Sequence, residues 1–150
     1  IDDFQYIMAN EFMRRVLVKE SGNAAFAKYN EIARSVWDII NAAAQAGDVK
    51  RVYMLSHTQN SEDGNVKIKT IGKLLDEKIT IEGMFTMVMR THVNQGEYLF
   101  STHNSGHDTV KTPLGMFADD YIPNDLKAVD AAITDFYGID AIVNPATNAA

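Results

Sequence analysis

The sequence contains no cysteine and only three prolines. The absence of cysteine excludes disulfide bonds and thiolate metal sites. The sequence also has no apolar run near the roughly 20 residues that a helix needs to cross a bilayer. No segment combines a basic start with an apolar centre, as a signal peptide does. We therefore expect a soluble protein with no membrane contact and a cytoplasmic location.

An excess of positive charge is missing too, because the formal net charge is −6. General binding of nucleic acid usually requires a basic face, so any contact with DNA must be local. A chain of 150 residues is long enough for one domain with its own core. We expect residues 1–138 to form one domain and residues 139–150 to form a weakly ordered tail.

Apolar residues recur at helical spacing in three segments, residues 6–18, 24–46 and 124–138. Asn124 is a suitable N-cap for the last of these segments, and Gly138 is a suitable stop. Each stripe of apolar residues predicts a helix that faces the core.

The rest of the chain predicts strands and loops between these helices. A short apolar run bounded by polar residues is typical of a buried strand, and a polar stretch without period is typical of a loop. The expected elements are a strand at 51–56, a loop at 57–66, a short helix at 70–78, a strand at 85–93 and a hairpin turn at 94–96 into 97–101. Helices that alternate with buried strands predict an α/β sheet that carries an antiparallel hairpin at its edge.

The chain opens on Ile-Asp-Asp-Phe-Gln, an apolar residue followed by Asp2 and Asp3. Paired acids after an apolar residue are most often a solvated turn. The same pattern ends the strand that holds Mg²⁺ in P-loop NTPases. Both interpretations are open on these residues alone.

Five segments in order, residues 1–8, 55–59, 69–78, 108–117 and 124–130, are similar to a known family. The chain resembles the C-terminal part of RecA-like ATPases, most closely the phage-encoded recombination ATPases of the Sak type. The resemblance implies a RecA-like P-loop fold, with a mostly parallel sheet, flanking helices and a C-terminal hairpin, truncated at its N-terminus. It also implies ATP and Mg²⁺ as cofactors and a role in DNA recombination or single-strand annealing. The expected partners are single-stranded DNA and further copies of the chain in a ring or filament, in the cytoplasm of a bacterial host.

The resemblance assigns the opening acids to the Walker B position. Asp2 is expected to hold Mg²⁺, because a hard cation prefers carboxylate oxygens. Asp3 is expected to orient or deprotonate the attacking water, although in this family the catalytic glutamate usually lies on an earlier strand. A third interpretation is a different Mg²⁺-dependent phosphotransfer enzyme that uses the same two acids.

The residues after the strand expected at 51–56 are assigned to nucleotide sensing. Ser56 and Thr58 are expected to contact the nucleotide. His57 and Gln59 are expected to sense the γ-phosphate, because an imidazole or amide can hydrogen-bond a phosphate oxygen or the attacking water. Taken alone, His57 is more simply a histidine that caps backbone groups at a strand end.

Basic residues complete the assignment. Lys67, Lys69 and Lys73 are expected to neutralise the phosphates of single-stranded DNA, although a solvated charged face explains them equally well. Lys111 is expected to reach the ATP of a neighbouring copy and stabilise the charge that develops on the transferred phosphoryl group. Arg90 is the alternative residue for this role, and it is otherwise a solvent-facing or ion-paired side chain.

The phosphate-binding loop Gly-x-x-x-x-Gly-Lys-Ser/Thr does not occur in the sequence. We expect this loop upstream of Ile1, and we expect the 150 residues alone not to hydrolyse ATP. The rival hypothesis is a non-enzymatic phage α/β module that binds a protein partner through its exposed hairpin edge.

Overall fold

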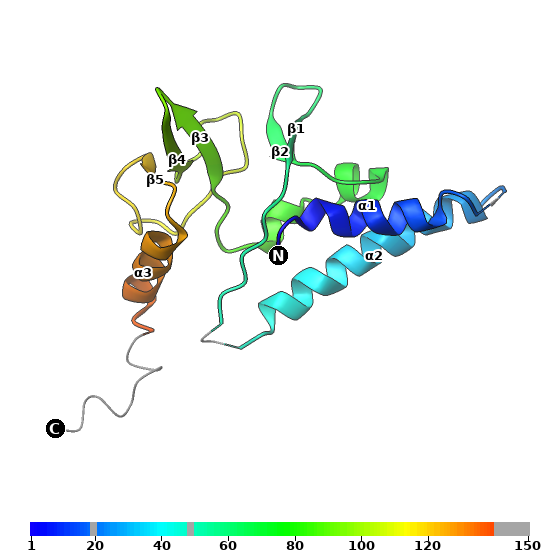
Figure 1. The fold of residues 1–150 in the computed structure, drawn as a ribbon, viewed down its shortest axis with the longest axis horizontal. Helices are drawn as coiled ribbons and strands as arrows, with labels where there is room; N and C mark the ends of the chain where they lie inside the picture. Colours follow the sequence, from blue (N-terminus) through cyan, green and yellow to red (C-terminus); the bar gives the residue numbers. More distant parts are fainter. Residues whose placement is uncertain (19–20, 48–49, 140–150) are drawn as a thin grey trace. The chain divides into compact units, whose positions relative to one another are not determined.

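The structure, a computed structural model, describes residues 1–18, 21–47 and 50–139 and is drawn in Figure 1. The chain divides into two compact units, Ile1–Met84 and Phe85–Ala150, and each is described by itself. Among the described residues, the first unit contains a helical hairpin and a two-stranded sheet, and the second contains a three-stranded sheet and one helix.

Helices α1 (Phe4–Arg15) and α2 (Ala24–Ala44) pack against each other as a helical hairpin (Figure 1). Asp3 caps α1, because its Oδ1 accepts a hydrogen bond of 3.0 Å from the backbone N–H of Gln5. The helices predicted at 6–18 and 24–46 are confirmed, with shifted ends. The apolar residues buried in this unit are Phe4, Met8, Ile32, Ala33, Val36, Ile40, Leu75 and Ile81.

The segment after α2 is extended but forms no strand at residues 51–56. Its backbone is held by the first residues of the chain. The N-terminal amino group of Ile1 donates to the carbonyl of Tyr53 at 2.6 Å, and the N–H of Leu55 donates back to Ile1 at 2.9 Å. The N–H of Phe4 then donates to the carbonyl of Leu55 at 2.7 Å. The strand predicted at 51–56 is therefore wrong, because these bonds hold the segment beside the chain start rather than inside a sheet.

The loop predicted at 57–66 is confirmed only at residues 61–65, because strands occupy both of its ends. Strands β1 (Thr58–Asn60) and β2 (Val66–Ile68) pair antiparallel, with Gln59 opposite Lys67. The helix predicted at 70–78 is a five-residue π-helical segment, η1 (Leu74–Lys78), and a 3-10 turn, η2 (Ile81–Met84), follows it.

The second unit is built on a sheet with the order β3-β4-β5, in which both pairs are antiparallel. Strand β3 (Arg90–Asn94) turns into β4 (Glu97–Ser101), which lies between β3 and β5 (Tyr121–Pro123). Phe100 of β4 is buried in this unit. The strand predicted at 85–93 is shorter than expected and begins at Arg90.

The turn between β3 and β4 has two central residues, Gln95 and Gly96, with φ angles of 49° and 87°. Positive φ at both positions defines a type I′ turn, which matches the twist of the two strands that it joins. The hairpin predicted at 94–96 is confirmed.

Helix α3 (Leu126–Tyr137) follows β5. Its N-cap is Asp125 rather than the predicted Asn124, because Asp125 Oδ1 accepts a hydrogen bond of 2.8 Å from the N–H of Lys127. Gly138 ends the helix in the left-handed conformation, as predicted. Of the tail expected at 139–150, residues 140–150 lie outside the described residues.

The RecA-like fold is wrong. Throughout residues 1–18, 21–47 and 50–139 the paired strands are all antiparallel, in one sheet of two strands and one of three. Parallel neighbours require long crossover connections, usually through a helix. Here each pair joins strands that are consecutive in the chain. The alternation of apolar segments therefore predicted a layered sheet that the strand pairing does not form.

Candidate functional site

The two opening acids have different surroundings. Asp2 is exposed, whereas Asp3 is half-buried. Besides capping α1 through Oδ1, Asp3 places Oδ2 at 2.9 Å from Nε2 of His57. The ring of Tyr6 meets the ring of His57 edge to face at 6.3 Å. Both carboxylate oxygens of Asp3 thus have partners within the chain, and His57 holds the segment after α2 against the start of α1.

The structure does not gather a protein metal cage around these acids. Within the described residues, no three side chains of His, Asp or Glu converge in a way that would hold a metal ion. Asp3 is already engaged by the helix end and by His57, which leaves Asp2 as the acid of this pair with an exposed carboxylate. Mg²⁺ usually binds one or two carboxylates and keeps several waters, so the assignment of Asp2 stays a prediction and we derive no step through a metal.

Ser56 and Thr58 flank His57 but face different surroundings. The hydroxyl of Ser56 is buried and has no hydrogen-bond partner among the described residues. Thr58 begins β1 and is exposed. The assignment of both hydroxyls to nucleotide contact stays a prediction.

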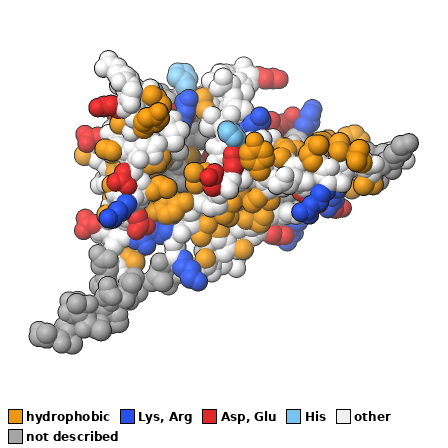
Figure 2. Space-filling view, in the orientation of Figure 1, with side chains coloured by type: hydrophobic (Ala, Val, Ile, Leu, Met, Phe, Trp, Pro, Cys, Tyr) orange, Lys and Arg blue, Asp and Glu red, His pale blue; other side chains and the backbone are white. Residues whose placement is uncertain are grey.

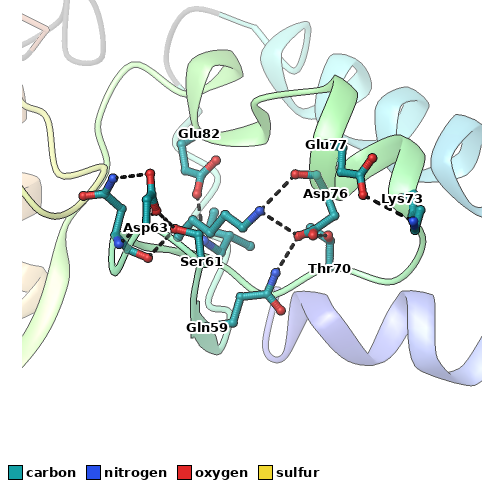
Figure 3. A network of polar contacts seen from close by, with 11 residues as sticks. Gln59, Ser61, Asp63, Thr70, Lys73, Asp76, Glu77 and Glu82 are labelled. Carbon is teal, nitrogen blue, oxygen red and sulfur yellow. Dashed lines mark hydrogen bonds and ion pairs between the residues drawn. The ribbon is translucent and has the colours of Figure 1, made fainter.

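Gln59 belongs to a polar network that closes the β1–β2 hairpin against η1 (Figure 3). Lys67 Nζ lies 3.0 Å from Asp76 Oδ1 and donates to the Asp76 carbonyl at 3.0 Å. The Nε2 of Gln59 donates to the same carboxylate oxygen at 2.5 Å, and the hydroxyl of Thr70 donates to it at 3.4 Å. The hydrogen bond from the Lys67 ammonium lowers the pKa of Asp76, with support from Thr70 and Gln59.

The loop of this hairpin carries a second network, which Figure 3 also shows. The carboxylate of Asp63 accepts hydrogen bonds from the Ser61 hydroxyl at 2.5 Å and from the Asn65 side chain at 2.7 Å. These hydrogen bonds lower the pKa of Asp63, and the bond from Ser61 has the largest effect. The loop residues are thus tied to one another.

The three lysines assigned to DNA do not form an open basic strip. Lys67 is committed to Asp76, and Lys73 lies 3.7 Å from Glu77. Lys69 is exposed, and its backbone N–H donates to the carbonyl of His57 at 2.9 Å, which extends the ladder by one pair. Asp76 and Glu77, which dilute the basic stretch in sequence, pair with two of its three lysines in space.

Lys111 and Arg90 lie in the second unit, whereas the other predicted site residues lie in the first. The backbone of Lys111 pairs with Val88 in an isolated antiparallel bridge of two hydrogen bonds, at 2.8 and 2.9 Å. Arg90 begins β3 and is exposed. Each of the two is therefore positioned by the β3 region of the sheet.

The most open feature of the second unit is β3, whose five residues are all exposed. The turn joins Asn94 and Glu97 as a hydrogen-bonded pair, and such pairs alternate along an antiparallel ladder. His92 and Arg90 are therefore bonded to β4. The backbone N–H and C=O groups of Thr91 and Val93 point away from β4, and no described strand pairs with them.

The other edge of this sheet is less suited to pairing with a further strand. Strand β5 has three residues and ends in Pro123, which has no backbone N–H to donate. Short strands and prolines are devices that keep sheet edges from pairing with other chains. Strand β3 is longer and contains no proline. Sequence reasoning located the hairpin but did not show which strand forms the open edge, because strand order is a tertiary property.

Side chains beside the β3 edge are exposed on both faces of the sheet. Val93 and Tyr98 form a cross-strand pair on one face and are 59% and 70% exposed. On the other face, the rings of His92 and Tyr121 meet across β4 with centroids 5.1 Å apart. A valine and a tyrosine on either side of a predicted turn were the available sequence signal for this surface.

Exposed apolar side chains also gather over the helical hairpin of the first unit, on the face drawn in Figure 2. They lie on α1, on the residues that directly follow it and on α2. The most exposed are Tyr6, Met13, Leu17, Val18 and Phe26. Phe26 was expected in the core but is exposed. The buried part of α2 is therefore shorter at the N-terminal end than the predicted apolar stripe.

Comparisons with protein-family models, curated proteins and solved structures found no match. Within the described ranges, no helix is long and apolar enough to cross a membrane. The function must therefore be inferred from the geometry of this chain.

Proposed function

We propose that this protein is an interaction module that binds an extended segment of a partner protein alongside β3. The single observation that supports this function is the open edge of β3, where Thr91 and Val93 direct backbone donors and acceptors outward. An extended segment that adds to such an edge gains main-chain hydrogen bonds. The exposed Val93 and Tyr98 pair on one face offers it an apolar contact.

ATP hydrolysis in DNA recombination stays a prediction from the resemblance. Three of the residues assigned to it, Asp3, His57 and Gln59, have other partners in this chain. Asp3 caps α1 and holds His57, and Gln59 donates to Asp76. The edge of β3, by contrast, needs no rearrangement before a segment is added.

A peptide selected from a random library on the purified chain tests this function. We expect the peptide to cause amide NMR shifts concentrated at Thr91 and Val93, with intermolecular contacts to β3. Val93→Pro removes an outward N–H without removing a ladder bond to β4. It should weaken peptide binding at least about tenfold while leaving the fold unchanged.

Tyr98→Pro is not a suitable control because Tyr98 lies on the central strand β4, where a proline would disturb the sheet itself. Lys127→Glu in α3 is the better one, since it changes an exposed side chain away from β3 and should leave binding unchanged. Selected peptides that bind the Val93→Pro variant equally well would contradict the proposal, as would peptides that shift amides elsewhere on a chain that is monomeric.

A further inference from the structure

Two charged side chains on the β3–β4 hairpin have no ion pair within the described part of their own chain. Arg90 is opposite Ser101 and Glu97 is opposite Asn94, so all four lie on one face of the sheet. Arg90 and Glu97 are separated by the length of the hairpin, about 14 Å at roughly 3.4 Å per residue. The hairpin thus carries a positive charge at one end and a negative charge at the other.

We propose that the segment received by β3 is β3 of a second copy of this chain, in an inference that rests on the proposed function. The copies pair antiparallel about a two-fold axis at His92. Thr91 of each copy then faces Val93 of the other, so the outward backbone groups of both residues are satisfied. Arg90 faces Asn94 of the other copy, and every residue of β3 (Arg90–Asn94) has a partner.

The charges of the hairpin complement each other in this register. Asn94 has Glu97 as its neighbour on one side and Arg90 of the second copy on the other. Neighbouring strands are about 4.8 Å apart, so Arg90 and Glu97 of different copies come within about 10 Å at their Cα atoms. Their long side chains extend toward each other over Asn94. The two-fold axis creates this pair twice, and neither Arg90 nor Glu97 faces its own kind.

The apolar face is matched by the same register. Val93 of one copy lies between Tyr98 of its own chain and Thr91 of the second copy. The buried Phe100 of the second copy is the next residue in that row. Pairing therefore covers Val93, which is 59% exposed in the single chain. The result is one continuous antiparallel sheet, to which each copy contributes three strands.

Sedimentation equilibrium of the full chain tests the homodimer through a charge exchange. We expect the wild-type chain to be a dimer at micromolar concentration. Arg90→Glu alone and Glu97→Arg alone should each weaken self-association at least about tenfold, because like charges then meet across the axis. Lys127→Glu, which makes the same change in net charge as Arg90→Glu but on α3, should leave the dimer intact.

Mixing the two single variants should restore a dimer. The glutamate introduced by Arg90→Glu in one chain then lies beside the arginine introduced by Glu97→Arg in the other, so this charge pair is reversed but still attractive. The second charge pair of the mixed dimer is the same as in the wild type. A chain that carries both changes should also self-associate. A mixture that stays monomeric, or single variants that dimerise like the wild type, would overturn the inference.

The homodimer and the proposed function fail in different ways. A wild-type chain that stays monomeric while a library peptide contacts Thr91 and Val93 overturns the homodimer and leaves the peptide-binding function standing. A dimer that survives Val93→Pro overturns the assigned interface. A monomeric chain with no peptide bound at β3 overturns both.

Discussion

The two β-hairpins of this protein have the same antiparallel pairing but differ in what covers their outer edges. In the β1–β2 hairpin, the outward N–H of Ile68 donates to the carboxylate of Glu82 at 2.7 Å, and Glu82 is only 7% exposed. In the β3–β4 hairpin, the outward groups of Thr91 and Val93 meet no described strand. A side chain from η2 thus satisfies an outward group of β2, whereas the outward groups of β3 have no such partner among the described residues.

The charges of the two hairpins differ in the same way. Lys67 in the first hairpin is paired with Asp76, whereas Arg90 and Glu97 in the second are too far apart to pair within the chain. Of the lysines that resembled a DNA-binding stretch, Lys67 is therefore used for internal structure. The hairpin that the rival hypothesis used as a partner-binding edge is the one with uncommitted groups. An uncommitted group is the better sign of a binding surface, because a satisfied one must first break its existing contacts.

The largest expected effect concerns what holds the open hairpin to its unit. Phe100→Ala should lower the free energy of unfolding of the second unit by about 3–5 kcal/mol, because it empties a buried aromatic site. Tyr98→Ala, on the same strand but 70% exposed, should change it by about 0.5 kcal/mol or less. Urea unfolding, monitored by hydrogen exchange of the β4 amides, measures both changes in the free energy of unfolding. Equal losses of stability in the two variants would show that Phe100 does not lie in the core of this unit.

The next effect concerns the β1–β2 hairpin, called the closed hairpin below. Asp76→Ala should destabilise the first unit by about 1–2 kcal/mol, because it leaves Lys67 and Gln59 without their shared acceptor at a partly exposed site. Glu77→Ala removes only the exposed pair with Lys73 and should cost about 0.5 kcal/mol or less. Amide exchange of β1 and β2 reports the difference. Similar costs for the two variants would mean that the Asp76 network does not close this hairpin.

The third effect concerns the turn that sets the register of the open hairpin. Gly96→Ala should destabilise the second unit by about 1–2 kcal/mol, because φ at this position is 87° and a Cβ is strained there. Gln95→Gly relieves the same strain at the preceding position and should be neutral or slightly stabilising. Thermal unfolding compares the two variants with the wild type. A neutral Gly96→Ala would argue against the type I′ turn.

The smallest effect is a pH dependence confined to the closed hairpin. The pKa of Asp76 is lower in the folded chain than its unfolded value of about 3.9. Its stabilising contribution is therefore complete above that value and is lost as the pH falls through the folded pKa. Asp76→Asn should make the stability of the first unit decline less steeply below about pH 4. Urea unfolding at several acidic pH values measures the slopes, and parallel curves for variant and wild type would refute the assignment.

Local patterns in the sequence predicted the elements that depend on near neighbours. The stripes of α1, α2 and α3 and the Asn94-Gln95-Gly96 turn were all recognised, because helical spacing and turn chemistry act over a few residues. The predictions are wrong where an apolar segment must pair with another segment of the chain. Residues 51–56 have strand composition, but hydrogen bonds to Ile1 and Phe4 take the place of a sheet.

The candidate site was less predictable than the fold for the same reason. Asp3 and His57 were singled out for phosphate chemistry, yet their contact with each other and the capping of α1 appear only when the chain is folded. Arg90 was named as a cation presented to a neighbouring copy. Its position on an open edge supports contact with a second copy in a different way, through strand pairing.

The sequence by itself determined the three helices, the tight β3–β4 turn and the absence of any cysteine chemistry, because each follows from residue type and short-range spacing. Only the tertiary structure decided which strands pair, which edge Glu82 covers and which edge is left open at Thr91 and Val93. These outcomes depend on hydrogen bonds and charges between residues far apart in the chain, and no local pattern encodes which of several chemically suitable partners each group will meet.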